Sequence, residues 1–135
     1  MTNALGALGT ELRRAGTKVA EVRTISGPGI TLDTTDVTSH DSTGGWEEVI
    51  ATILRSGTVT FEINYVPTAA THKNAAGGLI HDMIGRISST WTIVLGAVTL
   101  ASFTGYVTGF SPTANHDGSL SASCTIKPTG VVTLP

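Results

Sequence analysis

The feature that most constrains the fold is a long, alternating and almost uncharged stretch, FTGYVTGFSPTANHDGSLSASCTIKPTG, which runs from Phe103 to Gly130. The residues on one face of its last part are Leu120, Ala122, Cys124 and Ile126, and those on the other are Ser119, Ser121, Ser123, Thr125 and Lys127. A period of two is typical of a half-buried β-strand. Because small hydroxyls do not repel another chain, the pattern indicates a protein that buries its surfaces against copies of itself.

The composition points the same way. Only 13% of the 135 residues are charged, against about a quarter in ordinary soluble domains. An assembly subunit needs less surface charge than a monomer, because much of its surface lies in interfaces. The length indicates one domain, which we expect over residues 17–135, after a flexible arm over residues 1–16 whose three glycines weaken any helix.

Several functional classes are disfavoured. The net charge of −2 with scattered basic residues disfavours tight nucleic-acid binding. One cysteine excludes an internal disulfide, and we expect Cys124 to be a small buried hydrophobe. The sequence MTNALGALGTELRR lacks the features of a secretory signal, and no apolar run reaches the length of a membrane helix, so we expect a cytoplasmic protein until assembly.

The sequence offers no catalytic motif. Three histidines precede aspartates directly, at His40-Asp41, His81-Asp82 and His116-Asp117. Adjacent residues do not face each other on a strand or a helix, so these pairs are poor dyads. Neither a metal-ligand spacing nor a nucleophile motif is present. We therefore expect no enzyme, no cofactor and no metal site.

Two helices are expected between the strands. Trp46, Val49, Ile50, Ile53 and Leu54 fall at helical spacing, with two glutamates in the first turn, which predicts a short helix with a core-facing stripe. A second helix is expected from about Asn74 to Arg86.

Strands account for most of the remaining sequence. They are predicted over 17–25, 58–66, 90–95, 98–110 and 119–127. Residues 26–45 are expected to form a long polar loop, and the alternation of Ile30 and Leu32 suggests a projecting hairpin within part of it. The fold class is α+β and mainly β: a β-sandwich or half-barrel with one or two short flanking helices.

Three segments together resemble the tail tube protein (major tail protein) of lambda-like, long non-contractile-tailed phages, the siphophages. They are the stretch from Phe103 to Gly130, the segment GWEEVIATILRSGTVTFEINYVPT (Gly45–Thr68) and the segment DVTSHDS (Asp36–Ser42). The resemblance covers roughly residues 18–133. It implies packed sheets flanked by a helix, with six subunits closing a ring β-barrel around a lumen. Stacked hexameric rings would then form the virion tail tube that conducts DNA during ejection.

The resemblance also implies partners and a location. The partners are further copies, the tape measure protein, a tail-tip or baseplate initiator and a tail terminator. DNA passes without specific binding, and no membrane is involved. The subunit belongs to the virion tail, after residence in the host cytoplasm.

Two sets of site residues follow as hypotheses. The residues expected at the inter-ring contact are Ile30, Leu32, Asp33, Asp36, His40, Asp41, Arg13 and Arg14. The residues expected to face the lumen are Glu62, Asn64, Ser121, Ser123 and Lys127. An exposed surface acid is the alternative interpretation of Glu62.

Two other functional classes stay open. A β-sandwich binding module that decorates a capsid or baseplate predicts a stable monomer or trimer with saturable affinity for a glycan or a virion protein. A small hydrolase that uses one His-Asp pair is the weaker alternative, since no nucleophile motif accompanies it.

Overall fold

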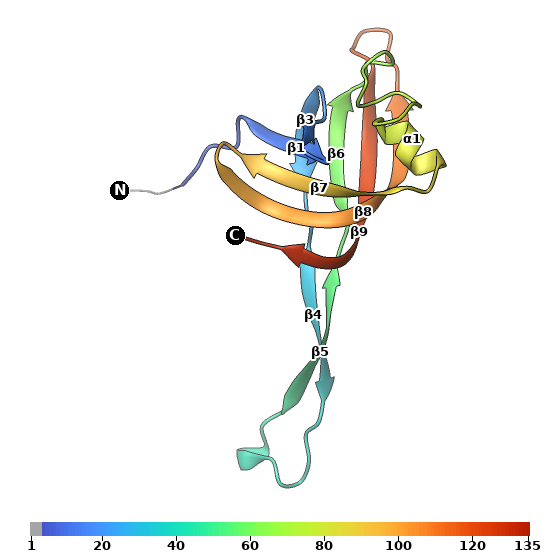
Figure 1. Cartoon of the computed structure of the whole chain (residues 1–135). Coiled ribbons are helices and arrows are strands. Elements are labelled where there is room, and N and C mark those ends of the chain that lie inside the picture. Colours follow the sequence, from blue (N-terminus) through green and yellow to red (C-terminus); the bar gives the residue numbers. More distant parts are fainter. Residues whose placement is uncertain (1–3) are drawn as a thin grey trace.

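A computed structural model describes residues 4–135, and its body is one curled, seven-stranded antiparallel sheet (Figure 1). The strand order is β2-β1-β7-β8-β9-β6-β3. The bounds are β1 Thr10–Arg14, β2 Thr17–Lys18, β3 Val22–Ser26, β6 Val59–Asn64, β7 Ser88–Leu95, β8 Val98–Thr113 and β9 Ser121–Thr133. The mainly β, half-barrel fold class predicted from the sequence is confirmed.

The concave side of the sheet holds the core, because every long strand alternates buried and exposed residues. Trp91 and Phe61 are the largest fully buried side chains, and Trp91 Nε1 donates a hydrogen bond to the Gly105 carbonyl at 3.2 Å. The predicted burial of Cys124 is confirmed, since its side chain is inaccessible. Burial also raises the pKa of the Cys124 thiol to about 12, because a thiolate would lose its hydration there.

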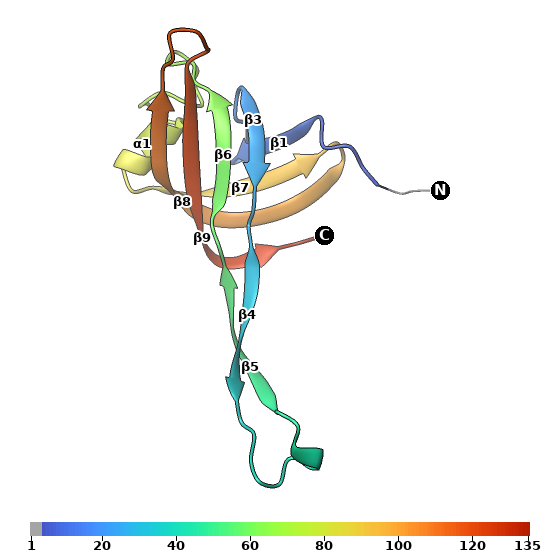
Figure 2. The same cartoon turned by 180° about the vertical axis from the view of Figure 1, so that it is seen from behind.

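The two edges of the sheet approach each other. β1 near one edge lies close to β3 at the other, and the sheet thereby curls into an incomplete barrel (Figure 2). The predicted first strand over residues 17–25 is divided, because the chain turns at Glu21, whose φ is 59°. Residues 10–14, expected within a flexible arm, instead form β1 and pair with β7, which corrects that part of the expectation.

A long hairpin extends from the body. It consists of β4 (Ile30–Asp36) and β5 (Val49–Ser56), with a short 3-10 turn, Thr43–Gly45, at its tip. Figures 1 and 2 show it projecting well beyond the sheet, on the continuation of β3 and β6. Two short segments, residues 27–29 and 57–58, connect it to the body, and we call them the neck. There the Gly57 N–H donates to the Gly29 carbonyl at 2.8 Å.

The helix predicted over residues 46–54 is wrong, because this segment contributes strand β5. Its apolar residues do fall at helical spacing, but Val49, Ile50 and Ile53 are β-branched, and such side chains favour a strand. β5 pairs along its length with β4, whose Leu32 lies opposite Leu54.

The second predicted helix is present but shorter. α1 runs from Leu79 to Ile84, whereas the expected range began near Asn74. The φ of Gly77 is +94°, a left-handed conformation, and Gly78 is extended, so the helix begins only after them. Leu79 reaches the core while Ile84 is exposed.

Candidate functional site

The hairpin exposes large apolar side chains along its whole length. Trp46 is 78% exposed and Leu54 is 71% exposed. The other exposed apolar residues of the hairpin are Ile30, Leu32, Val37, Val49, Ile50 and Ile53. Contiguous apolar surface of this kind marks an interaction site, since monomeric proteins rarely leave it in water.

Both faces of the hairpin carry this apolar surface. The register places Leu32 opposite Leu54 on one face, and Thr35 opposite Ile50 on the other. A shift in register between Leu32 and Thr34 marks a bulge. An isolated two-stranded hairpin is only marginally stable in water. Coverage of both faces by other chains would therefore stabilise this element.

The tip of the hairpin is held by a network of polar contacts. The Ser42 hydroxyl donates to Glu48 Oε2 at 3.0 Å, and the Glu48 N–H donates to the Thr38 hydroxyl at 2.8 Å. Hydrogen bonds from the hydroxyl and N–H of Thr38 lower the pKa of Asp36 below its ordinary value. These contacts organise the loop that carries Trp46, so the exposed indole belongs to a structured turn.

Charge is distributed unevenly between the hairpin and the body. Residues 30–56 hold five acidic residues and one basic residue, a formal net charge of −4. The rest of the chain holds five acidic and seven basic residues, a formal net charge of +2. The single base of the hairpin, Arg55, is paired with Asp33 at 2.6 Å. The hairpin and the rest of the chain thus carry formal net charges of opposite sign.

The predicted lumen residues lie together on the convex face of the sheet. Glu62 is opposite Ser123, and Asn64 is opposite Ser121, on the adjacent strands β6 and β9. Lys127 lies on the same face of β9, where its Nζ donates to the Ser56 carbonyl at 3.0 Å. The five predicted residues therefore give this face two hydroxyls, one amide, one acid and one base.

The predicted inter-ring residues are only partly brought together. Ile30, Leu32, Asp33, Asp36, His40 and Asp41 all lie on the hairpin or its tip. Arg13 and Arg14 do not, because β1 lies in the sheet. Arg13 pairs with Glu11 at 2.8 Å, and this contact lowers the pKa of Glu11, whereas Arg14 pairs with Asp82 inside the body. Both guanidinium groups therefore have partners in their own chain.

Of the exposed apolar residues of the hairpin, only Ile30 and Leu32 are among those predicted from the sequence to form a contact surface. The predicted helix would bury the stripe of Trp46, Val49, Ile50, Ile53 and Leu54, yet all five side chains are exposed on β5 and the tip. The β-branched run of this segment is the signal that favours a strand. Paired with the alternating Ile30 and Leu32, it would have indicated one long hairpin.

The described residues offer little for catalysis. Across residues 4–135 no three His, Cys, Asp or Glu side chains gather where they could hold a metal ion. His72 is fully buried, with one ring nitrogen 2.7 Å from the Ala20 carbonyl and the other accepting from the Val66 N–H. This histidine ties a loop to the β2–β3 turn. No helix in the described part of the chain is long and apolar enough to cross a membrane.

No protein-family model matches the sequence, and no curated protein matches it either. Solved structures do share the fold. A chain from the tail of an empty gene transfer agent (GTA) particle, refined with C6 symmetry, has a TM-score of 0.72 at 14% identity, covering 98% of this chain and 99% of that one.

Two further structures come from other particles. A chain of the PVC sheath-tube complex, an extracellular contractile injection system, has a TM-score of 0.69 at 14% identity and covers 98% and 93% of the two chains. A chain from the tube terminating cap of the anti-feeding prophage has a TM-score of 0.70 at 16% identity and covers 100% and 94%. At these identities the likeness establishes the fold. It does not single out lambda-like phages, so that finer assignment stays a prediction.

Proposed function

We propose that the protein is a structural subunit of a phage-like tail tube, which assembles into hexameric rings stacked around a lumen that conducts DNA. The proposal rests chiefly on one observation: the projecting hairpin exposes apolar side chains on both faces. Such an element is stabilised when neighbouring subunits cover it. The fold shared with tail components of other particles supports the same conclusion.

Stacking would use the hairpin as the contact to the next ring. Its net charge of −4 complements the +2 of the body, so head-to-tail contacts are favoured over contacts between two hairpins. A head-to-tail interface repeats, and it closes into rings or continues into filaments. Asp36, His40 and Asp41 lie at the hairpin end that would reach the neighbouring ring. The tape measure protein, an initiator and a terminator are the partners that such a tube requires.

The convex sheet face is the proposed lumen wall. Glu62, Asn64, Ser121 and Ser123 share it across β6 and β9. Hydroxyl and amide groups release few counterions from phosphates, so DNA would slide along this face without being held. The open edges of the curled sheet would pair with neighbouring subunits, which closes the ring barrel and protects the edges.

The test is assembly of the purified subunit, alone and co-expressed with tail initiators. Electron micrographs of concentrated protein are expected to show rings or tubes with six-fold symmetry. Replacing Leu54 by Ser should abolish them without unfolding the subunit, because Leu54 is mostly exposed. Val98→Thr is the matched control, since Val98 is an exposed residue of β8 beside the β7–β8 turn. A subunit that stays monomeric under both conditions would contradict the proposal.

A second candidate is a terminating component of a tail, supported by the likeness to a chain from a tube terminating cap. A terminator is expected to form a single ring and to stop growth of another protein's tube. Long tubes of the purified chain would exclude this candidate. A stable monomer or trimer that binds a capsid or baseplate protein would favour the decorating module instead.

A further inference from the structure

An apolar groove lies where the base of the hairpin meets the last part of β9. It has a volume of ≈ 580 Å³. One wall comes from the hairpin, with Ile53 and Leu54, and the other from residues 127–132 of β9. Val131 in this wall is 85% exposed. Large apolar residues therefore face water on both sides of the groove.

A second exposed apolar surface lies on the N-terminal segment, residues 5–9. Leu8 is fully exposed and Leu5 is 76% exposed. Residues 1–10 include no charged side chain. Gly6 and Ala7 separate the two leucines and Gly9 follows them, so the backbone can approach another surface closely. The segment is therefore suited to an apolar groove that also has polar backbone at its rim.

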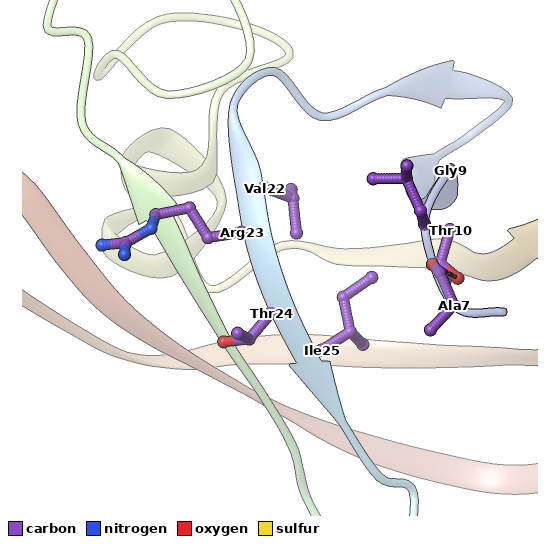
Figure 3. Close-up of a pocket in the computed structure, with 8 residues that line it drawn as sticks. Ala7, Gly9, Thr10, Val22, Arg23, Thr24 and Ile25 are labelled. Atoms are coloured by element: carbon purple, nitrogen blue, oxygen red, sulfur yellow. Dashed lines mark hydrogen bonds between the residues drawn. The ribbon is translucent and has the colours of Figure 1, made fainter.

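In its own molecule the N-terminal segment lies beside β3. Residues 7–10 and β3 enclose a pocket of ≈ 340 Å³ (Figure 3). In this view Val22 and Ile25 point toward Ala7 and Thr10, while Arg23 and Thr24 point away. The Thr10 hydroxyl and N–H both bond to the Ala7 carbonyl. Leu8 also lines this pocket, yet its side chain is fully exposed to solvent.

The same molecule cannot fill its own groove in this arrangement. Figures 1 and 2 place the N-terminal segment beside β1 and β7, apart from the hairpin base. The two surfaces lie on different parts of one chain. Binding of the segment of one copy to the groove of another is therefore a head-to-tail contact. The groove adjoins the hairpin that the proposed function already assigns to subunit contacts.

We propose that the groove receives the N-terminal segment of a second copy, with Leu8 as the anchoring side chain. Leu54 and Val131 would enclose the leucine. Lys127 has three N–H donors, one of which is used by the Ser56 carbonyl, and another would bind a carbonyl of the incoming segment. This inference rests on the proposed function and adds to it, because the N-terminal segment of the second copy would fill the groove between the hairpin and β9.

The experiment is disulfide trapping between two single-cysteine variants, Leu8→Cys and Val131→Cys, each in a Cys124→Ala background. A mixed disulfide between them can form only between copies, when the two Cα atoms come within about 7 Å. Equal amounts are mixed, assembled and oxidised gently. Pelleted and soluble fractions are then separated by sedimentation and examined on non-reducing gels. The control pair is Leu8→Cys with Val98→Cys, which is exposed but outside the groove.

The expected result is a mixed dimer in the pelleted fraction for the first pair and little for the control. A second measurement is the concentration needed for assembly. Leu8→Asp should raise the concentration needed for assembly by about tenfold or more, because this variant has no apolar side chain to bury in the groove. Leu8→Met keeps an apolar side chain and should leave that concentration near the wild-type value. Assembly without the mixed dimer, and with Leu8→Asp unaffected, overturns this inference and leaves the proposed function standing. Failure of the wild type to assemble overturns both.

Discussion

Arg14 and Asp82 lie 68 positions apart in the chain, and the guanidinium of Arg14 donates two hydrogen bonds to the Asp82 carboxylate, with Nη2–Oδ1 at 2.9 Å. The Asp82 side chain is inaccessible to solvent, and that of Arg14 is 20% exposed. Ser89 supplies a third hydrogen bond to the same carboxylate. The pair therefore joins β1, α1 and β7 at one point.

Removing one member of this pair should destabilise the fold. Arg14→Met leaves a buried carboxylate that keeps the hydrogen bond from the Ser89 hydroxyl. We expect the free energy of unfolding to fall by about 3 kcal/mol, the low end for a broken buried pair, because Arg14 is partly exposed. Urea unfolding followed by circular dichroism measures it. Arg13→Met is the control, since its partner Glu11 is at the surface. Equal effects of the two variants would refute a special role for Arg14.

Trp46 should report assembly by its fluorescence. The chain has two tryptophans; Trp46 is exposed and Trp91 is fully buried. In the free subunit we expect acrylamide to quench Trp46 readily, and in the assembled state we expect this component to disappear, because neighbours cover the hairpin. Trp46→Phe removes the component in both states. Unchanged quenching after assembly would show that the hairpin tip stays in water.

Gly105 should tolerate no side chain. A Cβ at this position would lie 2.7 Å from the Lys127 carbonyl oxygen on the adjacent strand, which is too close for carbon and oxygen. Gly105→Ala is expected to destabilise the protein by about 1–3 kcal/mol, as overpacking does. Gly109→Ala, on the same strand, is the control, because its Cβ would meet Thr125 at 3.4 Å. Thermal unfolding of the two variants compares them.

Cys124 should be unreactive in the folded protein. Its buried thiol has its pKa raised from an ordinary 9.0 to about 12, so iodoacetamide at pH 8 is expected to label it only in urea. Because the thiol loses its proton near pH 9 in the unfolded chain but only near pH 12 in the fold, its contribution to the free energy of unfolding is fully present below pH 9. This contribution falls as the pH rises from 9 toward 12. The difference in unfolding free energy between wild type and Cys124→Ala should therefore shrink between pH 8 and 10.5. A constant difference would contradict this linkage.

The strands of the body could be predicted from the sequence because each buries one face. Cys124 and Ile126 alternate with Thr125 and Lys127 in the chain, and in the fold they point to opposite sides of β9. The same alternation placed Glu62 and Ser123 on polar faces. It could not show that these two residues lie opposite each other, since that depends on the pairing of β6 with β9.

Hydrophobic periodicity does not reveal the hairpin, because neither of its faces is buried within the chain; the β-branched residues of β5 are the local signal that favours a strand. Ile50 and Ile53 lie at positions that also suit one side of a helix, and local spacing cannot distinguish the two structures when no core decides between them. In the fold, hydrogen bonding to β4 makes this segment a strand. Likewise, the ion pair of Arg14 with Asp82 joins distant segments that no local pattern connects.

The neck described above has a mechanical consequence. The hairpin is joined to the body by two short segments, which are linked by the hydrogen bond from the Gly57 N–H to the Gly29 carbonyl. Beside them, Lys127 Nζ donates to the carbonyl of Ser56, the last residue of β5. In a fibre built from such subunits, we expect curvature to be taken up at these narrow junctions while each barrel keeps its shape. The bore would then stay open when the fibre bends.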